Sequence, residues 1–287
     1  MTLAPEPVQP PAFPHRPLGR TGLKLPVLGL GVAGPLASPL AQSSLVSELV
    51  KTALVEGITL FDSAPFYGEG RAEQRLGTAL GDTQQDGITL FSKGGTRHGP
   101  NGLIKDFSEN GLRAQLSETL SCLPKIDVFF LHGPSKEALS PALMTMLETL
   151  RSEGLFHHLG IAGRGPEIDR AIEIGGFDVL MAPVHFDLSI PEIDRLERAR
   201  KAGLGVVGIE SLLPATGKPR LSLRPLDLWY SARALKRRVF NPFALRADPV
   251  DCLNWALTSG LADTVLVGTT RPENLRQNIE IARKACG

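Results

Sequence analysis

Eight short apolar runs recur along the chain, and segments with the spacing of amphipathic helices separate them. Strands that alternate with helices pair in parallel, and eight such strands are the number that closes into a barrel. The sequence therefore predicts an α/β fold, a (β/α)8 TIM barrel. The runs that we interpret as strands are 27–33, 58–62, 88–92, 128–132, 158–162, 179–183, 205–209 and 264–268.

The segments between these runs carry apolar residues at helical spacing. In 43–55, Leu45 and Leu49 fall on one stripe. Ser43 or Ser44 is the predicted N-cap of this helix. Three of the remaining helices open near a proline, a residue that is favoured in a first helical turn. These remaining predicted helices are 107–123, 139–151, 166–174, 191–202 and 272–284.

A doubly wound open sheet is the structural alternative. Such a fold normally carries a GxGxxG phosphate-binding turn directly after its first strand. The corresponding stretch here reads LGLGVAGPL, in which Pro35 follows Gly34 and the glycine spacing is different. The motif is therefore absent, and the number of strands favours the barrel.

The N-terminal segment contains many prolines. We expect residues 1–15 to be a flexible lead-in and residues 16–287 to form a single barrel domain. The stretch RPLGRTGLKLPVLGL is typical of a hairpin, with its turn at or near Arg20 to Gly22. An N-terminal β-hairpin of this kind would close the bottom of the barrel.

Charge and cysteine content exclude several classes of protein. The 31 Lys and Arg residues balance 30 Asp and Glu residues, and the densest basic run, 236–238, is too short for a nucleic-acid surface. The three cysteines lie far apart, which argues against a disulfide scaffold or a metal site and for a reducing compartment. No apolar stretch is long enough to cross a membrane, and the N-terminus lacks the pattern of a signal peptide. We therefore expect a cytoplasmic protein without nucleic-acid or membrane partners.

Segment 211–243 interrupts the alternation of strands and helices. It contains four prolines together with Trp229, Tyr230 and Phe240, and we interpret it as one long loop. Because it follows the seventh predicted strand, it should lie at the carboxyl end of the sheet, where barrel active sites are found. Its aromatic residues, with Phe66, would either line a substrate pocket or pack against one another.

Four polar residues stand at or just beyond the ends of consecutive predicted strands. The carboxyl ends of neighbouring barrel strands meet at the same mouth, so these side chains should converge. The unperturbed pKa of tyrosine is about 10, and a neighbouring ammonium group lowers it, while a carboxylate holds the ammonium in place. A histidine can orient a carbonyl oxygen or help to relay a proton. The four candidate catalytic residues are Asp62, Tyr67, Lys93 and His132.

Three stretches resemble the diagnostic blocks of the aldo-keto reductases: GITLFDSAPFYGEGRAEQRLGTAL, ITLFSKGG and IDVFFLHG. Weaker similarity extends from PLGRTGLKLPVLGLG to VLVGTTRPENLRQNI, and it covers nearly the whole chain. The resemblance implies that Tyr67 is the proton donor. It also implies hydride transfer between a nicotinamide coenzyme, usually NADPH but with NADH possible, and an aldehyde or ketone, or the reverse reaction on an alcohol or sugar.

The residues expected around the nicotinamide ring depart from the family pattern. A Ser-Asn pair, a glutamine and a stacking aromatic residue are all replaced, and each lost hydrogen bond weakens binding by roughly 0.5 to 1.5 kcal/mol. Arg164 and His185 are nearby candidates to take over these contacts. The residues at the altered positions are Ala162, Gly163, Met181, Ile209 and Glu210.

The resemblance places the adenosine end of the coenzyme at the start of the last predicted helix. Helix N-termini bind anions through free N–H groups and the helix dipole. Arg271 would pair with a 2′-phosphate, which favours NADPH over NADH. The residues implied to bind the coenzyme are Gly31, Asp62, Gly268, Thr269, Thr270, Arg271, Asn274 and Asn278.

Two functions are consistent with the sequence. The first is an NADPH-dependent oxidoreductase that acts on a small-molecule carbonyl or alcohol substrate, which the complete set of four catalytic residues favours. The second is a reductase-like barrel that binds a nucleotide or a partner protein with weak or no turnover, which the altered nicotinamide positions favour.

Overall fold

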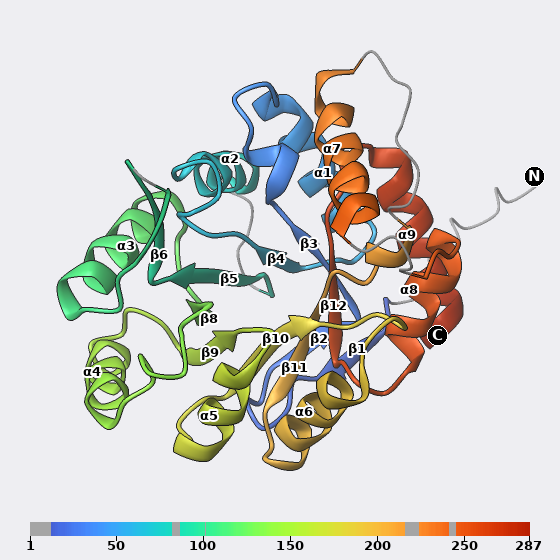
Figure 1. Ribbon diagram of the computed structural model, residues 1–287. Coiled ribbons are helices and arrows are strands. Elements are labelled where there is room, and N and C mark those ends of the chain that lie inside the picture. Colours follow the sequence, from blue (N-terminus) through green and yellow to red (C-terminus); the bar gives the residue numbers. More distant parts are fainter. Residues whose placement is uncertain (1–12, 82–86, 101, 216–223, 241–244) are drawn as a thin grey trace, which may run out of the picture.

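The computed structural model describes residues 13–81, 87–100, 102–215, 224–240 and 245–287 (Figure 1). Its centre is a closed barrel of eight parallel strands, whose order around the barrel follows the order along the chain. Each predicted run contains one strand, with slightly shifted ends, so the (β/α)8 barrel is confirmed. The strands are β3 (Leu28–Gly31), β4 (Leu60–Asp62), β5 (Thr89–Gly94), β8 (Val128–His132), β9 (His158–Ala162), β10 (Val179–Pro183), β11 (Gly205–Ile209) and β12 (Thr264–Val267).

Side chains inside the barrel form a core that is separate from the one beneath the helices. Successive residues of a strand point to opposite faces of the sheet. In β8, Val128 and Phe130 accordingly belong to the inner core, whereas Phe129 packs outward against the helices. The rings of Phe91 and Phe130 fill the interior, with centroids 5.3 Å apart. The barrel is therefore solid below its mouth.

An N-terminal hairpin of β1 (His15–Pro17) and β2 (Lys24–Pro26) closes the amino end of the barrel, as predicted. Leu18 and Leu25 of this hairpin are buried in the inner core. Gly19 has a φ of 48° and approaches the start of β11 so closely that a Cβ would lie 2.2 Å from the nitrogen of Gly205. Only glycine fits there. The opposite, carboxyl end of the barrel is left for the site.

Helices surround the barrel on its outer face (Figure 1). All six predicted helices are present, and prolines stand in the first turns of several of them, as expected. The predicted serine N-cap of α1 is wrong, because Gln42 occupies the cap position and makes no capping hydrogen bond through its side chain. The helices are α1 (Ser43–Val55), α2 (Arg71–Leu80), α3 (Glu109–Cys122), α4 (Pro141–Ser152), α5 (Pro166–Ile174), α6 (Ile190–Lys201), α7 (Pro225–Phe240), α8 (Pro249–Thr258) and α9 (Pro272–Cys286).

Helix α7 shows that the prediction of one long loop over 211–243 is wrong. Pro225 stands at the start of the helix, where a proline ring is tolerated because the first N–H groups have no partner within the helix. Pro214 lies in a separate short 3-10 helix, Leu213–Ala215. The basic run 236–238 consequently lies on α7. Residues 216–223 and 241–244 of this segment are outside the described part.

Three further elements were not predicted from the sequence: α2, α8 and a hairpin of β6 (Thr96–Gly99) and β7 (Gly102–Lys105). Helix α2 is mostly polar, and its buried apolar residues Ala72, Leu76 and Leu80 form a narrow stripe with a spacing of four. Hairpin β6–β7 is short and largely exposed, so it lacks a clear hydrophobic pattern. Both elements flank the carboxyl end of the barrel next to β5.

The chain is already packed at the first described residue. Phe13 is buried in the core, and β1 begins at His15. Residues 1–12 of the predicted flexible lead-in lie outside the described residues, and the division into a lead-in and one domain stays a prediction. Within the described residues, no helix is long and apolar enough to cross a membrane.

Candidate active site

The four predicted catalytic residues lie together at the carboxyl end of the barrel. Strands β4, β5 and β8 are adjacent and parallel, so their ends meet at one side of the mouth. Asp62 ends β4 and His132 ends β8, while Lys93 lies near the end of β5. Tyr67 comes from the loop between β4 and α2. The parallel register thus brings together residues that are separated by about seventy positions in the chain.

Lys93 and Asp62 form a buried ion pair. The Nζ atom of Lys93 lies 2.5 Å from Oδ1 of Asp62 and also donates a hydrogen bond to the carbonyl oxygen of Ser63 at 2.9 Å. The two side chains are 2% and 7% exposed, respectively. Removing one partner of such a pair leaves a buried charge without compensation, at a cost of about 3 to 5 kcal/mol. Asp62 and the carbonyl of Ser63 therefore fix the position of the amine.

The phenol of Tyr67 lies against this amine. The Nζ atom of Lys93 is 5.1 Å from the centroid of the Tyr67 ring. The rings of Tyr67 and His132 meet edge to face, with centroids 5.8 Å apart, and Phe66 packs against His132 at 5.5 Å. A phenol, an amine, a carboxylate and an imidazole consequently share one small volume at the mouth.

Glycine shapes the loop that presents Tyr67. Gly68 has a φ of 64°, and a Cβ at this position would lie 2.2 Å from the carbonyl oxygen of Ala37. The next residue, Glu69, also has a positive φ, 57°, which is uncommon for a residue other than glycine. The backbone N–H of Tyr67 donates to the carbonyl of Ala64 at 3.0 Å. The tight turn therefore holds the ring in place.

Burial and charge set the protonation states of Lys93 and Tyr67. Burial alone would lower the pKa of Lys93, but the charges and hydrogen bonds of Asp62 and Tyr67 outweigh it and raise that pKa. Burial raises the pKa of Tyr67, and the charge of Lys93 opposes this effect without overcoming it. The expected lowering of the tyrosine pKa by lysine is thus present, but the expected net direction is wrong. The phenol keeps its proton.

His132 is a neutral imidazole at neutral pH. Burial lowers its pKa to about 3, and the positive charges of Lys93, Lys105 and Arg164 add to the effect. A neutral ring can hydrogen-bond to a carbonyl oxygen, whereas a role as a charged proton relay is disfavoured. Its backbone carbonyl accepts hydrogen bonds from Thr96 Oγ1 at 2.6 Å and from Lys105 Nζ at 2.9 Å. Hairpin β6–β7 therefore holds His132 in position.

The altered nicotinamide positions on β9 and β10 hold apolar residues, and the loops that follow β9 and β11 hold charged ones. Ala162 and Met181 are buried and offer no side-chain hydrogen-bond donor. Arg164 and Glu210 form an ion pair, with Nη1 and Oε2 2.6 Å apart. Ala162, two residues before Arg164, pairs with His132 in the register of β8 and β9, so Arg164 follows a residue that lies beside His132. Arg164 and Glu210 were both identified from the sequence as residues near the nicotinamide, and the structure shows that they contact each other.

Two glycines lie at the rim of the barrel where the coenzyme is expected, Gly31 at the end of β3 and Gly268 directly after β12. A Cβ on Gly268 would lie 3.4 Å from the carbonyl oxygen of Gly31, and a Cβ on Gly31 would meet only the carbonyl oxygen of Val267, at 3.7 Å. Glycines let a ligand approach the main chain closely. Together with the N-terminus of α9, these two strand ends fit the phosphates and the adenosine of a nicotinamide dinucleotide.

The remaining residues implied to bind the coenzyme lie just before α9 or within its first two turns. Thr269, Thr270 and Asn278 are buried, and Asn274 is half-buried. The Oγ1 atom of Thr269 accepts a hydrogen bond from the backbone N–H of Arg271 at 3.1 Å. Their role in binding the coenzyme stays a prediction.

Arg271 is held by an acidic residue that sequence reasoning did not consider. Its Nη2 atom lies 2.7 Å from Oδ2 of Asp227 on α7. Asp227 is 1% exposed, so this is a buried carboxylate beside the expected 2′-phosphate position. No sequence signal pointed to Asp227, because its segment was interpreted as a loop.

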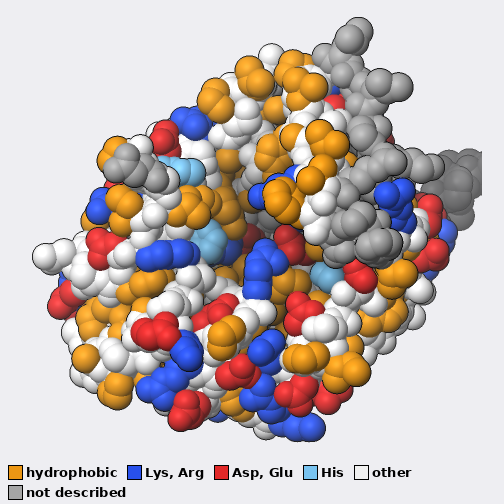
Figure 2. All heavy atoms as spheres, viewed as in Figure 1, with side chains coloured by type: hydrophobic (Ala, Val, Ile, Leu, Met, Phe, Trp, Pro, Cys, Tyr) orange, Lys and Arg blue, Asp and Glu red, His pale blue; other side chains and the backbone are white. Residues whose placement is uncertain are grey.

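Aromatic side chains border the mouth from two sides. Phe66 lies beside His132, and the ring of Trp229 covers Gly34, where a Cβ would be 3.1 Å from the ring. Phe240, at the end of α7, is exposed. Figure 2 shows a recess near the centre of the face that carries α7, with hydrophobic, charged and histidine side chains around it. Within the described residues, no cluster of His, Cys, Asp and Glu is placed to hold a metal ion.

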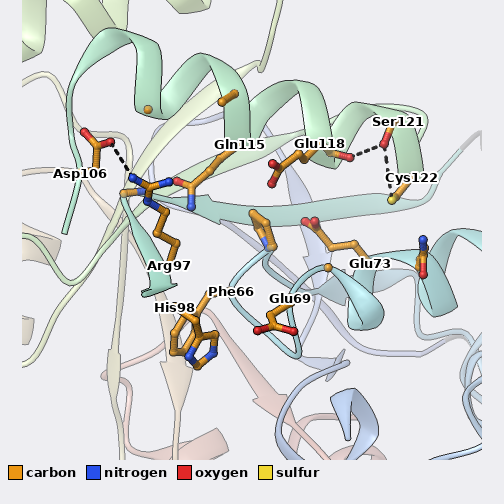
Figure 3. Close-up of a pocket in the computed structure, with 16 residues that line it drawn as sticks. Phe66, Glu69, Glu73, Arg97, His98, Asp106, Gln115, Glu118, Ser121 and Cys122 are labelled. Carbon is orange, nitrogen blue, oxygen red and sulfur yellow. Dashed lines mark hydrogen bonds and ion pairs between the residues drawn. The ribbon is translucent and has the colours of Figure 1, made fainter. Parts of the chain in front are cut away.

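A separate cleft of about 430 Å³ lies outside the barrel, between α2 and α3 (Figure 3). Glu73 lines it and is 1% exposed. Its carboxylate accepts hydrogen bonds from Ser92 Oγ at 2.6 Å and Thr119 Oγ1 at 3.1 Å. Burial raises the pKa of Glu73 to about 7, although these hydrogen bonds act in the opposite direction. Because Ser92 precedes Lys93, Glu73 ties α2 to the strand that carries the catalytic lysine.

Known proteins resemble this chain over nearly its whole length. It is 29% identical over 303 residues to D-threo-aldose 1-dehydrogenase from a Pseudomonas species, covering 91% of this chain and 90% of that protein. It is 27% identical over 291 residues to L-galactose dehydrogenase from Arabidopsis thaliana, covering 92% and 86%.

The fold also matches solved structures. A putative aldo-keto reductase from Pseudomonas aeruginosa superimposes with a TM-score of 0.75 at 25% identity, and the match covers 95% of both chains. Residues 28–217 match the model of the Aldo/keto reductase family, which is well over half of the chain. The four side chains at the mouth lie in the three sequence blocks that resemble those of the aldo-keto reductases. This chain belongs to the Aldo/keto reductase family.

Proposed function

We propose that the protein exchanges a hydride between a nicotinamide coenzyme and the carbonyl carbon of a small aldehyde, ketone or sugar, with Tyr67 as the proton donor. In the reducing direction the carbonyl compound, the reduced coenzyme and one proton give the alcohol and the oxidised coenzyme, and the reaction runs either way. The two similar dehydrogenases act on aldoses and on L-galactose by their names, which supports a sugar or hydroxyaldehyde substrate.

One observation carries this proposal: the phenol of Tyr67 lies against the buried ion pair of Lys93 and Asp62. A phenol that holds its proton at neutral pH can deliver it to a carbonyl oxygen. The ammonium group of Lys93 stabilises the phenolate that is left behind, and Asp62 keeps that ammonium in place. In the oxidising direction Tyr67 takes the proton back from the alcohol.

His132 orients the substrate. As a neutral imidazole it donates a hydrogen bond to the carbonyl oxygen, which aligns the carbonyl with Tyr67 and polarises it. The bound coenzyme supplies the hydride. Gly31, Gly268 and the start of α9 would hold its phosphates and adenosine, as the bare backbone at these positions supports.

The ion pair between Arg271 and Asp227 supports NADH as the preferred coenzyme, in contrast to the NADPH expected from the sequence. A 2′-phosphate that approached Arg271 would also approach the buried carboxylate of Asp227, and like charges repel. A ribose 2′-hydroxyl carries no such penalty. The alternative of a barrel that binds without turnover gains no support from the described residues, because the four catalytic side chains are assembled.

The substitution Tyr67→Phe tests the proposal. It removes the hydroxyl group and leaves the ring, so reduction of aldehydes should fall by about 10² to 10⁴-fold. Coenzyme affinity, measured by quenching of protein fluorescence, should stay within about twofold. Reduction at the wild-type rate in this variant would remove Tyr67 from the role of proton donor.

A further inference from the structure

Three charged side chains from three different elements form a chain of ion pairs at the barrel mouth. Arg164 follows β9, Glu210 follows β11, and Arg233 lies on α7. Arg164 Nη1 is 2.6 Å from Glu210 Oε2, and Arg233 Nη2 is 2.7 Å from Glu210 Oε1. Each carboxylate oxygen of Glu210 is thus paired with a different arginine, and Arg233 in turn lies over the ring of Trp229.

Glu210 is held in an unusual conformation. Its φ is 58°, in the left-handed region that side chains with a Cβ rarely adopt, and such strain persists where the surroundings enforce it. Burial would raise its pKa, but the hydrogen bond and charge of Arg164, together with the charge of Arg233, hold that pKa below its usual value. Glu210 is therefore a fixed anion at neutral pH.

Arg164 is the member of the trio that faces outward. Its side chain is 59% exposed, whereas that of Glu210 is 20% exposed. Its backbone is fixed, because the N–H of Arg164 donates to Glu167 Oε1 at 2.5 Å. Ala162, two residues before Arg164, pairs with His132 in the register of β8 and β9, so the loop that carries Arg164 begins beside His132. The positive charge of Arg164 also acts to lower the pKa of His132, and it opposes the net rise in the pKa of Tyr67. A molecule whose carbonyl oxygen meets these two residues consequently places its neighbouring atoms near Arg164.

We propose that Arg164 and Glu210 are the substrate-recognition pair of this enzyme, and that they bind the hydroxyl groups next to the reacting carbonyl of a polyhydroxylated substrate. This inference rests on the proposed function. The guanidinium group donates hydrogen bonds to hydroxyl oxygens, and the carboxylate accepts one from a hydroxyl O–H through a lone pair that its ion pairs leave open. A vicinal diol offers both kinds of partner within a short distance.

The pair selects against apolar substrates. An apolar aldehyde would displace water from charged groups without replacing its hydrogen bonds. Neutral hydroxyl groups satisfy both charged partners, so the polyol class fits this pair.

Glyceraldehyde and propanal test the proposal, because they share a three-carbon aldehyde chain and differ only in two hydroxyl groups. We would measure kcat/KM for both with the wild-type protein and with Arg164→Met, which keeps much of the aliphatic side chain and removes the donors. The value for glyceraldehyde should fall about 10- to 100-fold in the variant, as expected for lost hydrogen bonds to a charged group. The value for propanal should fall by at most about threefold.

Two further variants provide a second test of the pair and a control. Glu210→Gln keeps the shape of the side chain and should also lower the preference for glyceraldehyde over propanal. Arg113→Met is the matched control, because Arg113 is also an arginine with ion pairs to acidic side chains, those of Glu109 and Glu153, but on the outer surface. This control should leave both kcat/KM values unchanged.

The outcomes separate this inference from the proposed function. An unchanged preference for glyceraldehyde in Arg164→Met, or an equal fall for both aldehydes, would overturn the recognition role while the enzyme still reduces carbonyls. A weakened coenzyme affinity in Arg164→Met, measured by fluorescence quenching with the aldehyde preference intact, would assign the pair to the coenzyme instead and also overturn the inference. A wild-type protein that binds coenzyme but reduces neither aldehyde would overturn the proposed function itself.

Discussion

The guanidinium of Arg271 at the start of α9 is ion-paired with the buried carboxylate of Asp227 on α7, at 2.7 Å. The pair joins the segment after β11 to the segment after β12 across the rim of the barrel. The guanidinium that the family resemblance assigns to a 2′-phosphate is thus already paired with the carboxylate of Asp227. We therefore expect the coenzyme preference to depend on α7 as well as on α9.

Asp227→Asn should shift the coenzyme preference toward NADPH. The variant removes the negative charge that repels a 2′-phosphate and leaves Arg271 available to it. We expect the ratio of the Kd for NADPH to the Kd for NADH to fall by about tenfold or more. Fluorescence titration with each coenzyme measures this ratio, with Asp251→Asn on the exposed face of α8 as the control. An unchanged ratio would show that Asp227 has no part in the selection.

The ion pair of Lys93 and Asp62 should show strong coupling in a double-mutant cycle. Lys93→Met alone leaves a buried carboxylate without its partner and should lower the free energy of unfolding by about 3 to 5 kcal/mol. Adding Asp62→Asn removes that uncompensated charge and should restore a large part of the loss. Urea denaturation of the four proteins measures the coupling. Simple additivity of the two single changes would contradict the buried pair.

Two glycines of the Tyr67 loop offer a matched comparison. Gly70 has a φ of 84° with open space around a Cβ, so Gly70→Ala should cost only the strain of a left-handed residue, about 1 to 2 kcal/mol. Gly68→Ala adds a collision with the carbonyl of Ala37 and should move the loop. We expect kcat/KM to fall at least tenfold for Gly68→Ala and to change little for Gly70→Ala. Equal activity in both variants would argue against the close contact.

Glu73 should make the folded state less stable as the pH rises. Its pKa of about 7 in the folded protein exceeds the ordinary value of 4.5, so the folded state holds this proton more tightly than the unfolded state. Its contribution to stability is therefore greatest below about pH 4.5 and is lost as the pH rises through 7, by at most about 3 kcal/mol.

Glu73→Gln removes this titration. The difference in free energy of unfolding between wild type and variant should change in favour of the variant between pH 5 and pH 8, as measured by urea denaturation. Glu148→Gln, at an exposed position on α4, serves as the control. A pH-independent difference for Glu73→Gln would mean that the carboxyl group titrates normally.

The sequence specified the barrel because its strands are short, apolar and separated by helices. Residues 128–132 illustrate this, since a continuous run such as VFFLH is buried on both faces of a parallel sheet. Helix α7 could not be predicted in the same way. Its segment contains several prolines, and only the fold shows that one of them, Pro225, stands at the first position of a helix. Helix α2 was missed because a polar helix gives a weak periodic signal.

The four predicted catalytic residues could be grouped from the sequence because Asp62, Lys93 and His132 stand at or near strand ends and Tyr67 lies in the loop after β4, so the barrel topology brings them together. The contacts of Asp227 and Glu210 were not predictable, because each joins segments that are distant in sequence. The net pKa direction of Tyr67 was also missed. A sequence shows that a lysine is near, but the degree to which the phenol is buried depends on the packing around it.

The hairpin of β1 and β2 closes the amino end of the barrel, where Leu18 and Leu25 are buried in the inner core. In the part of the chain that the structure describes, the amino end of the barrel is filled, so substrate and product would both reach the four side chains from the carboxyl end. Substitutions in the loops at that end, or in hairpin β6–β7, can therefore change the rates of entry and release together and leave the strands unaltered.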